Sequence, residues 1–541
     1  MAHHPSNDAA GSHAWRTTLR LVAVVTLARL AALLWVCTIP LIEDEAFYWE
    51  WGLRPALSYY TKGPGIAWLI RASTELLGTS EFGVRASAPI CGAVVALCVA
   101  AMARMAGGPR AALFACVCVL CAPMLQAASL LMTIDGPYAA CWAVCAWAGM
   151  YALLRHGRWS WALAGAALGV GFLFKYTIVA LPISLACFAM ACRRDLRLAP
   201  GWKAFLAAGT VLAMLGTVPV LVWNAQRDWP TLSHLLGHLG VRGGDMPVTQ
   251  GPSGWRYSPA WTATYLASPL GLIGPAVIAA AAGVWRAFAG RGVEQLAERR
   301  LLATCAAPLL VFYLAVSFVT EPEGNWAMAA FITALALAGV EIDRGMSEWE
   351  ARFARWRALP EPRPRQGWVL ARPQSGALLV WWATLVVGTV AGLALPLADR
   401  VAAAMPRVVP ASRLTGIRDM AAHADRTLAE LAARDGGKPF LIAMHYGRAA
   451  QLRFYMKGRP KAYCSGRTLG HGRVTQYDFW EDTDLKDPAL IGRPALVVGG
   501  TEASWAPFFG TVGAPFTLDG DRKRSRPAFV CSDYKGPGAA P

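Results

Sequence analysis

Charged residues are scarce in this chain: 16% of the 541 residues are charged, 55% are hydrophobic, and the mean hydropathy is +0.37. This composition supplies too little polar surface for an ordinary soluble enzyme, which is therefore excluded. Acidic residues are the rarer charge, with 34 Asp and Glu against 51 Lys and Arg, so the net charge is +17. In a membrane protein such an excess records orientation more often than nucleic-acid binding.

Several motifs are also missing. The glycine pairs at 107–108 and 499–500 lack the spacing of a nucleotide-binding loop and are predicted as turns. No internal repeat is present, although many transporters are built from one. Of the 13 cysteines, all but Cys464 and Cys531 lie in apolar stretches, where cysteine acts as a small hydrophobe. Those two can form a disulfide in an oxidising compartment or remain thiols, and the sequence leaves both open.

Apolar runs dominate the chain up to residue 397, and we expect about eleven membrane-spanning helices of about 20 residues each. The run 19–40 is too long for a signal-peptide core and lacks a convincing cleavage site, so it is predicted as an uncleaved first helix whose Arg29 faces the helix bundle. The other spans are expected at 84–104, 111–130, 136–154, 161–174, 177–192, 204–224, 262–285, 301–319, 327–341 and 375–397.

The charges predict the orientation of these spans. With the N-terminus inside, roughly twenty Lys and Arg fall in cytoplasmic loops against about seven on the other side, as the positive-inside rule requires. We therefore expect residues 1–18 in the cytoplasm, a transmembrane module over 19–397 and its first outer loop at about 41–83. An odd number of spans places the tail, 398–541, outside the cytoplasm.

The tail is predicted to be a small soluble α/β domain. A helix is expected over 419–434, where Ala and Leu recur at helical spacing, with Gly436-Gly437 as its stop. Short strands are expected at 440–444, 461–464 and 495–498, and a helix at 448–456.

The first outer loop contains the most reactive residue types. Glu43, Asp44 and Glu45 stand side by side at the membrane boundary and offer a base. Tyr59 and Tyr60 offer ring surfaces for a sugar or lipid, and the Lys62 that follows them offers a cation for phosphate. An acidic loop with interfacial aromatic residues accounts for the same pattern without any chemistry, and the residue types do not decide between the two.

Further polar residues fall at the same predicted membrane face. Lys175 stands at the outer end of a helical hairpin, where its ammonium can reach a lipid phosphate while its stem stays in apolar surroundings. The other candidates at this face are Thr133, Asp135, Tyr176, Trp223, Asn224, Arg227, Asp228, Trp229, Glu321, Glu323, Asn325 and Trp326.

No metal ligand is assigned. The three adjacent acids are oxygen donors that suit Mg²⁺ or Mn²⁺, but neighbouring residues point in different directions and no histidine cluster completes a site. His234 and His238 are expected to form a solvent-facing pair. No cofactor is therefore certain, and a divalent cation stays an open alternative.

A series of motifs resembles a known family. E-D-E-A-F-Y-W-E-W, Y-Y-T-K-G-P-G-I-A-W-L, M-T-I-D-G-P, F-K-Y-T, P-V-L-V-W-N-A-Q-R-D-W and E-G-N-W-A follow one another as in bacterial GT-C glycosyltransferases. This group includes the dolichyl-phosphate-mannose protein mannosyltransferase-like enzymes and the lipid A aminoarabinose transferase. The tail motifs H-Y-G-R-A-A-Q-L-R-F-Y-M-K-G-R-P and Q-Y-D-F-W resemble the periplasmic domain of such enzymes.

The resemblance implies a multi-pass enzyme of the bacterial inner membrane with a GT-C fold and a periplasmic tail. Its activity would be the inverting transfer of a sugar from a polyprenyl phosphate to a periplasmic glycan, lipid A or protein. The family's catalytic aspartate maps onto Asp44, with Glu45 beside it, and the departing phosphate would be held by Lys62, Lys175 and Arg227 or Arg256.

Two departures limit what the resemblance implies. Many relatives have an acid, or Asp-His, before a Pro-Pro pair where this chain has Thr61-Lys62-Gly63-Pro64, and Ser268 stands where many have Gln. A second catalytic acid or a metal site in the first loop is therefore in doubt, and the sugar is not assigned. A transporter or lipid flippase, and a membrane assembly protein whose tail binds envelope partners, are the alternatives.

Overall fold

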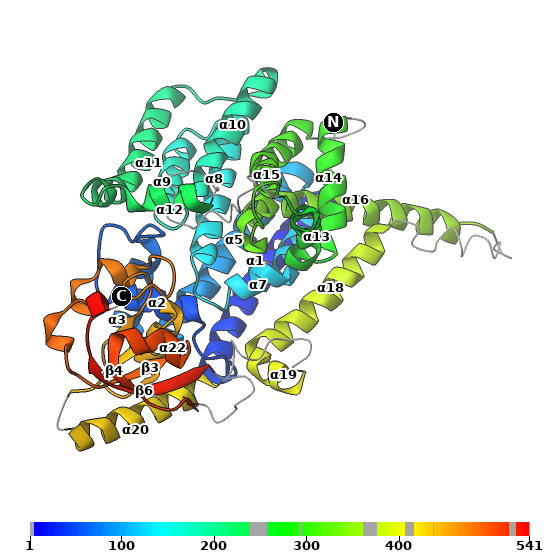
Figure 1. Ribbon diagram of the computed structural model, residues 1–541. Helices are drawn as coiled ribbons and strands as arrows, with labels where there is room; N and C mark the ends of the chain where they lie inside the picture. The colour runs from blue at the N-terminus through cyan, green and yellow to red at the C-terminus, as the bar shows by residue number, and fades with distance from the viewer. Residues whose placement is uncertain are drawn as a thin grey trace. The chain divides into compact units, whose positions relative to one another are not determined.

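The computed structural model describes residues 5–238, 257–290, 295–360, 376–405, 416–435, 438–518 and 526–539 (Figure 1). The chain divides into two compact units. Unit 1 comprises Met1–Trp35, Arg85–Val222 and Gln250–Leu395, and unit 2 comprises Val36–Val84, Trp223–Thr249 and Pro396–Pro541. Unit 2 therefore joins the first loop and the tail, which the sequence analysis assigned to different domains.

Unit 1 is a bundle of helices. Its elements are α1 (Pro5–Trp35), α5 (Ser87–Gly107), α6 (Pro109–Cys121), α7 (Pro123–Ala128), α8 (Asp135–Leu154), α9 (Ser160–Phe172), η1 (Tyr176–Val179), α10 (Ala180–Ala191), α11 (Trp202–Ala225), which runs on into unit 2, α13 (Pro259–Ile273), α14 (Ala276–Ala289), α15 (Leu296–Val316), η3 (Gly324–Ala327), α16 (Ala330–Arg357) and α18 (Gly376–Ala394). Most of them overlap the predicted spans, because long apolar runs form helices that satisfy their own backbone hydrogen bonds, but α1 begins and α16 ends well outside the predicted limits.

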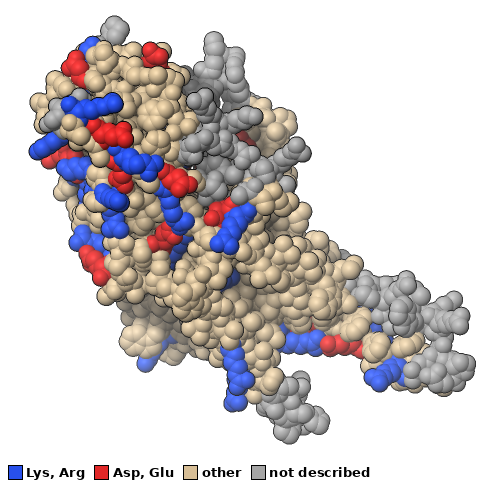
Figure 2. Space-filling model, turned by 90° about the horizontal axis from the view of Figure 1, so that it is seen from below, with Lys and Arg blue, Asp and Glu red and all other residues tan. Residues whose placement is uncertain are grey.

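Six helical stretches in the described residues are long and apolar enough to cross a membrane: Ser12–Trp35, Glu81–Gly107, Asp135–Leu154, Trp202–Ala225, Leu296–Val316 and Gly376–Ala402. A seventh is reached if α13 and α14 count as one span, and three further apolar helices have 10–17 residues. Large apolar side chains such as Leu27, Val386 and Val390 are exposed at the surface. Figure 2 shows charged residues in groups with wide uncharged areas between them. The chain is a membrane protein; the expected number of about eleven spans stays a prediction.

Two predicted spans are not continuous helices. The stretch 262–285 forms α13 and α14, which meet at an angle of 110°. Gly274 lies between them with a φ of +65°, and the following Pro275 has no N–H to continue a helix. The stretch 111–130 likewise breaks between α6 and α7 before Pro123. Composition identifies both stretches as apolar, but Gly and Pro decide where they bend.

Unit 2 contains a mixed sheet with the order β2-β1-β3-β6-β4, in which β5 also pairs with β6. Strands β1 (Phe440–Ala443), β2 (Ala462–Cys464) and β3 (Ala495–Val498) are parallel and were predicted, as were the helices α20 (Ile417–Asp435) and α21 (Tyr446–Tyr455). Helix α21 packs on β1 and β2, and α20 packs on α21 and β3. The predicted helix stop at 436–437 lies outside the described residues.

The antiparallel part of the sheet was not predicted. It consists of β4 (Phe509–Val512), β5 (Phe516–Thr517) and β6 (Pro527–Tyr534). β5 is only two residues long, which is too short for an alternating pattern, and β4 contains Gly510, a residue type that is depleted in strands. Phe440, Ile442, Val497 and Phe529 are buried in the core of this unit.

The sheet order excludes a disulfide between the two tail cysteines. Cys464 ends β2 and Cys531 lies in β6, and β1 and β3 stand between these strands. Adjacent strands are about 4.8 Å apart, so the two residues are separated by about 14 Å. A disulfide needs Cα atoms within about 7 Å. Both residues are free, buried thiols, and burial raises the pKa of each to about 12.

The first loop is folded rather than open. Glu43–Gly52 forms α2 and Gly65–Leu77 forms α3, and most of α2 is buried. Helix α2 packs against α21. Their first turns meet at Gly447, where a Cβ atom would lie 2.4 Å from the Cβ of Glu43. Only glycine permits this approach, which joins the first loop to the tail within unit 2.

Candidate functional site

In unit 1 the polar residues predicted from three separate loops form one cluster around Asp135, the first residue of α8. Oδ1 of Asp135 accepts a hydrogen bond from Nζ of Lys175 at 3.1 Å, and Oδ2 accepts one from Nδ2 of Asn325 at 2.8 Å. The hydroxyl of Thr133 accepts the backbone N–H of Asp135 at 3.4 Å. A carboxylate is favourable at this position because the N-terminus of a helix is positively polarised.

The Asp135–Lys175 pair is nearly buried, with side chains 9% and 11% exposed. The ammonium also lies 5.3 Å from the ring centre of Tyr138, whose hydroxyl is 2.9 Å from that of Thr177. In such surroundings a charged lysine needs a compensating anion. The structure thus holds the Lys175 ammonium at a defined place beside the Asp135 carboxylate.

In unit 2 the acids of the first loop occupy the first turn of α2, where the helix dipole favours negative charge. Oε2 of Glu43 lies 3.5 Å from Nδ1 of His445, and Oε1 lies 3.7 Å from Nη2 of Arg448. Asp44 is partly exposed. Burial, reinforced by the Asp44 carboxylate, raises the pKa of Tyr446 to about 12. The phenol therefore remains a hydrogen-bond donor at neutral pH.

Glu45, predicted as the second catalytic carboxylate, has a structural role. It is fully buried, and its Oε2 accepts the backbone N–H of Ile42 at 3.0 Å. An acid at the third helical position that bonds back in this way caps the N-terminus of a helix. Asp44 therefore remains the one partly exposed candidate of the two.

Tyr59 and Tyr60 were predicted to offer ring surfaces to a substrate, but unit 2 buries both. The Tyr59 hydroxyl donates to the carbonyls of Trp51 and Arg54 at 2.9 and 3.0 Å, and its ring stacks on Trp51. Tyr60 packs beside Phe479, and its hydroxyl has no hydrogen-bond partner within the described part of the chain. Aromatic composition alone does not distinguish a core residue from a binding surface.

Lys62, the remaining predicted site residue of the first loop, is partly exposed. Its carbonyl accepts hydrogen bonds from the Tyr59 N–H and the Ser58 hydroxyl at 3.1 and 3.3 Å. These two bonds close the turn that presents the lysine.

The segment after α11 contains one candidate in a structural role and one at the surface. Asn224 is buried, and its Oδ1 accepts the N–H of Thr231 at 3.1 Å, which closes the loop before α12 (Pro230–His238). Arg227 is exposed and lies 4.9 Å from the ring centre of Trp223. Arg256 lies outside the described residues.

The predicted solvent-facing histidine pair is wrong for His234, which is 3% exposed because it packs beside Tyr60. The side chain of His238 lies outside the described residues. Within the described residues no group of three or more His, Cys, Asp or Glu is placed to hold a metal ion.

Glu50, which is fully buried, was not among the predicted site residues. Its Oε1 accepts from Arg453 at 2.7 Å and from Arg54 at 3.2 Å, and its Oε2 accepts from the Tyr477 hydroxyl. Two of these partners lie in the tail motifs quoted for the family resemblance. Those motifs were the available signal, but about 400 residues separate them from Glu50, too far for spacing to pair them.

Comparisons with known proteins agree with the motif series. The family model of the dolichyl-phosphate-mannose-protein mannosyltransferases matches residues 61–223. The lipid A galacturonosyltransferase RgtD of Rhizobium johnstonii is 26% identical over 333 residues, which are 60% of this chain and 65% of that protein. The match thus spans somewhat less than two thirds of the relative.

Solved structures show the same fold. ArnT from Cupriavidus metallidurans bound to undecaprenyl phosphate superimposes with a TM-score of 0.60 at 16% identity, covering 96% of this chain and 98% of ArnT. The archaeal oligosaccharyltransferase AglB from Archaeoglobus fulgidus, in complex with an inhibitory peptide and a dolichol-phosphate, gives a TM-score of 0.51 at 11% identity, covering 96% and 74%. These matches confirm the resemblance to GT-C glycosyltransferases and the predicted fold class.

Proposed function

We propose that this chain, which has the GT-C fold, is a multi-pass glycosyltransferase of the bacterial inner membrane that takes a sugar from a polyprenyl phosphate. Its N-terminus is cytoplasmic, and unit 2 lies on the periplasmic side, where the acceptor is found. The observation that carries this proposal is the nearly buried Asp135–Lys175 pair with its Asn325 contact. Asp135 and Lys175 lie within the stretch matched by the mannosyltransferase family model.

The reaction is a single displacement at the anomeric carbon. The acceptor hydroxyl attacks as the bond to the phosphate oxygen breaks, and Asp44 takes the hydroxyl proton as general base. One displacement inverts the configuration at that carbon. The other product is the polyprenyl phosphate, which leaves with the bonding electrons.

The leaving phosphate gains negative charge, and fixed positive charge stabilises it most where water is restricted. Lys175 supports this role because its ammonium is shielded and held by a carboxylate. Lys62 and Arg227 are the more exposed cations of the set. Asp135 and Asn325 act by holding Lys175 in place.

For the acceptor we propose lipid A, because the curated relative is named as a lipid A glycosyltransferase. The donor sugar is left unassigned. If the acceptor group is a phosphate, it is already ionised near neutral pH, and Asp44 then orients the acceptor or stabilises charge rather than removing a proton.

The test is sugar transfer by purified protein in lipid nanodiscs, from a polyprenyl-phosphate-sugar mixture to lipid A, detected as a mass increase of lipid A. We expect Asp44→Asn to abolish transfer while the protein remains folded. Asp419→Asn, the same exchange at an exposed aspartate in the first turn of α20, is the matched control and should transfer normally. Transfer at the normal rate by Asp44→Asn would remove Asp44 from the catalytic role.

Two further measurements test the proposed activity against a transporter or flippase and test the proposed orientation. A transporter or flippase moves its substrate without changing its mass, so the absence of a glycosylated product from lipid A, glycan and protein acceptors alike would favour that reading. A reporter fused after Pro541 should be active in the periplasm. Cytoplasmic activity would overturn the orientation but not the transfer reaction.

A further inference from the structure

Arg29 is a charged residue within an apolar helix of unit 1. It lies in the membrane-spanning part of α1, Ser12–Trp35, and its Nη2 donates to the carbonyl of Leu120 at 3.5 Å. A charge inside a membrane bundle is costly and usually has a specific task. The proposed reaction makes no use of this residue.

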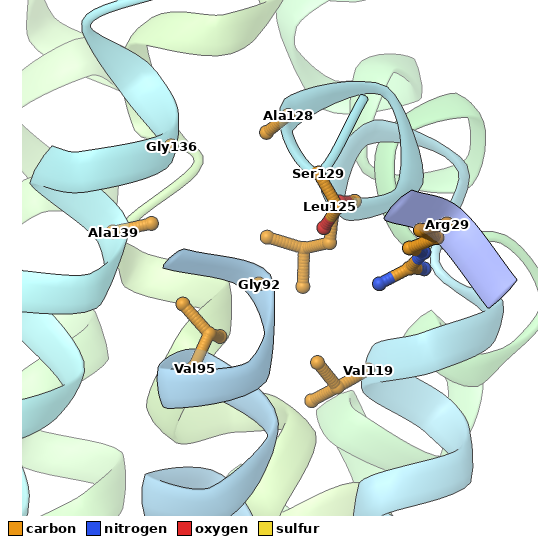
Figure 3. Close-up of a pocket in the computed structure, with 9 residues that line it drawn as sticks. All are labelled: Arg29, Gly92, Val95, Val119, Leu125, Ala128, Ser129, Gly136 and Ala139. Atoms are coloured by element: carbon orange, nitrogen blue, oxygen red, sulfur yellow. The ribbon is translucent and has the colours of Figure 1, made fainter. Parts of the chain in front are cut away.

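The guanidinium borders a small cavity of about 10 Å³ (Figure 3). In Figure 3 it points from α1 toward the Ser129 hydroxyl, with Gly92 and Val95 of α5 on the opposite side. Ser129 donates to the carbonyl of Leu125 at 2.6 Å, which leaves its oxygen able to accept. The cavity is at the lower limit for one water molecule, which would accept from Arg29 and donate to Ser129.

Arg29 contacts the chain where one helix ends and the next begins. Helix α6 ends at Cys121, and α7 starts at Pro123, which has no N–H to continue the hydrogen-bond ladder. The last carbonyls of α6, among them that of Leu120, therefore need other donors, and a cation at a helix C-terminus is favourable. Arg29 supplies both the donor and the charge.

The chain beyond this break leads directly to the candidate site. Helix α7 ends at Ala128, and the turn 129–134 connects it to Asp135 at the start of α8. Ser129, at the start of this turn, and Gly136, next to Asp135, both line the cavity. We infer that Arg29 is a positioning residue: it anchors the segment 122–134 and thereby sets the place of Asp135. The link to Asp135 rests on the proposed function.

The anchoring itself is tested without any activity measurement. Hydrogen exchange followed by mass spectrometry in nanodiscs should show amides of 122–134 exchanging about tenfold faster in Arg29→Met than in the wild type, as expected when a partly buried cation leaves a helix C-terminus. Arg20→Met is the matched control, because Arg20 lies on the same helix, is exposed and is not part of the cavity lining. Wild-type exchange in 122–134 of Arg29→Met would overturn the proposal.

A second variant tests the cavity with Arg29 intact. A Cβ at Gly92 would lie 2.2 Å from the Ser129 hydroxyl and 3.4 Å from Nη1 of Arg29, so Gly92→Ala pushes the two apart. We expect it to accelerate exchange in the same segment, and unchanged exchange would count against the cavity contact. If Arg29→Met does not fold, Arg29→Lys and Gly92→Ala decide the question, since lysine keeps the charge and should keep slow exchange.

The transfer assay then tests the link to Asp135. Arg29→Met should lower kcat about tenfold with the donor KM changed less than threefold. A displaced Asp135 would weaken stabilisation of the charge that develops on the leaving phosphate, which affects the chemical step more than donor binding. Arg29→Lys should recover most of the lost kcat, which a purely volume-filling role would not explain. Faster exchange with unchanged kcat would keep the anchor but overturn its role in transfer, whereas failure of the proposed function would abolish transfer in the wild type as well.

Discussion

Replacing Asp135 by asparagine removes the charge from the cluster at the start of α8 while keeping the shape of the side chain. Lys175 then faces a neutral amide in a site where the two side chains are only 9% and 11% exposed. Removing one partner of a buried ion pair costs about 3–5 kcal/mol. Because Asn325 can still donate to the new amide oxygen and both side chains retain some exposure, we expect the lower end, about 3 kcal/mol.

A double-mutant cycle that combines Asp135→Asn with Lys175→Met measures the coupling free energy between the two side chains. Each single variant leaves a charge or polar group without its counterpart, whereas the double variant leaves neither charge. We therefore expect the double variant to be about as unstable as either single one, with a coupling free energy of about 2–3 kcal/mol. Unfolding is followed by circular dichroism during denaturant titration in detergent micelles.

An exposed ion pair provides the control. Arg71 and Glu75 lie 2.7 Å apart with side chains 42% and 61% exposed, and Glu75→Gln should change stability by less than about 1 kcal/mol. If Asp135→Asn is as stable as the wild type and the two single effects simply add, the pair contributes no interaction energy. The assignment of Lys175 as a charge held by Asp135 would then be refuted.

Three other expectations concern unit 2. Glu50→Gln leaves two arginines facing a neutral, fully buried amide and should cost about 3–5 kcal/mol in unit 2, measured by thermal unfolding. Non-reducing peptide mass mapping should find Cys464 and Cys531 as free thiols, and a linked peptide would contradict the strand order. Burial lowers the pKa of His445 below its unfolded value, so the free energy of unfolding should fall as the pH drops below about 6.5. His445→Gln should weaken that fall between pH 6.5 and 5. An unchanged pH profile in this variant would show that His445 is not the group responsible.

Local sequence was sufficient for most elements of the fold. The predicted spans 136–154 and 204–224 agree with α8 and α11 to within two residues at each end, and the predicted strand 495–498 is β3. Apolar runs of helical length and short β-branched runs between turns are local patterns. The bend at Gly274-Pro275 was missed because the apolar run continues across it.

The candidate site was only partly predictable. Asp135, Lys175 and Asn325 were identified as polar residues at one predicted membrane face, and the structure joins them by direct hydrogen bonds. Tyr59 and Glu45 looked equally reactive from composition, yet both are used internally, as a core aromatic and as a helix cap. Residue type indicates what a side chain can do, but its partners decide what it does.

The properties of this protein therefore fall into two groups with different origins. The membrane character, the positions of most helices and the GT-C resemblance follow from hydropathy, charge placement and motif order along the chain, which are local or additive quantities. The burial of Glu50, the separation of Cys464 from Cys531 and the counter-charge of Lys175 depend on residues far away in the sequence. Only folding brings such residues together, because burial, strand order and ion pairing are properties of positions in space, and chain spacing does not encode them.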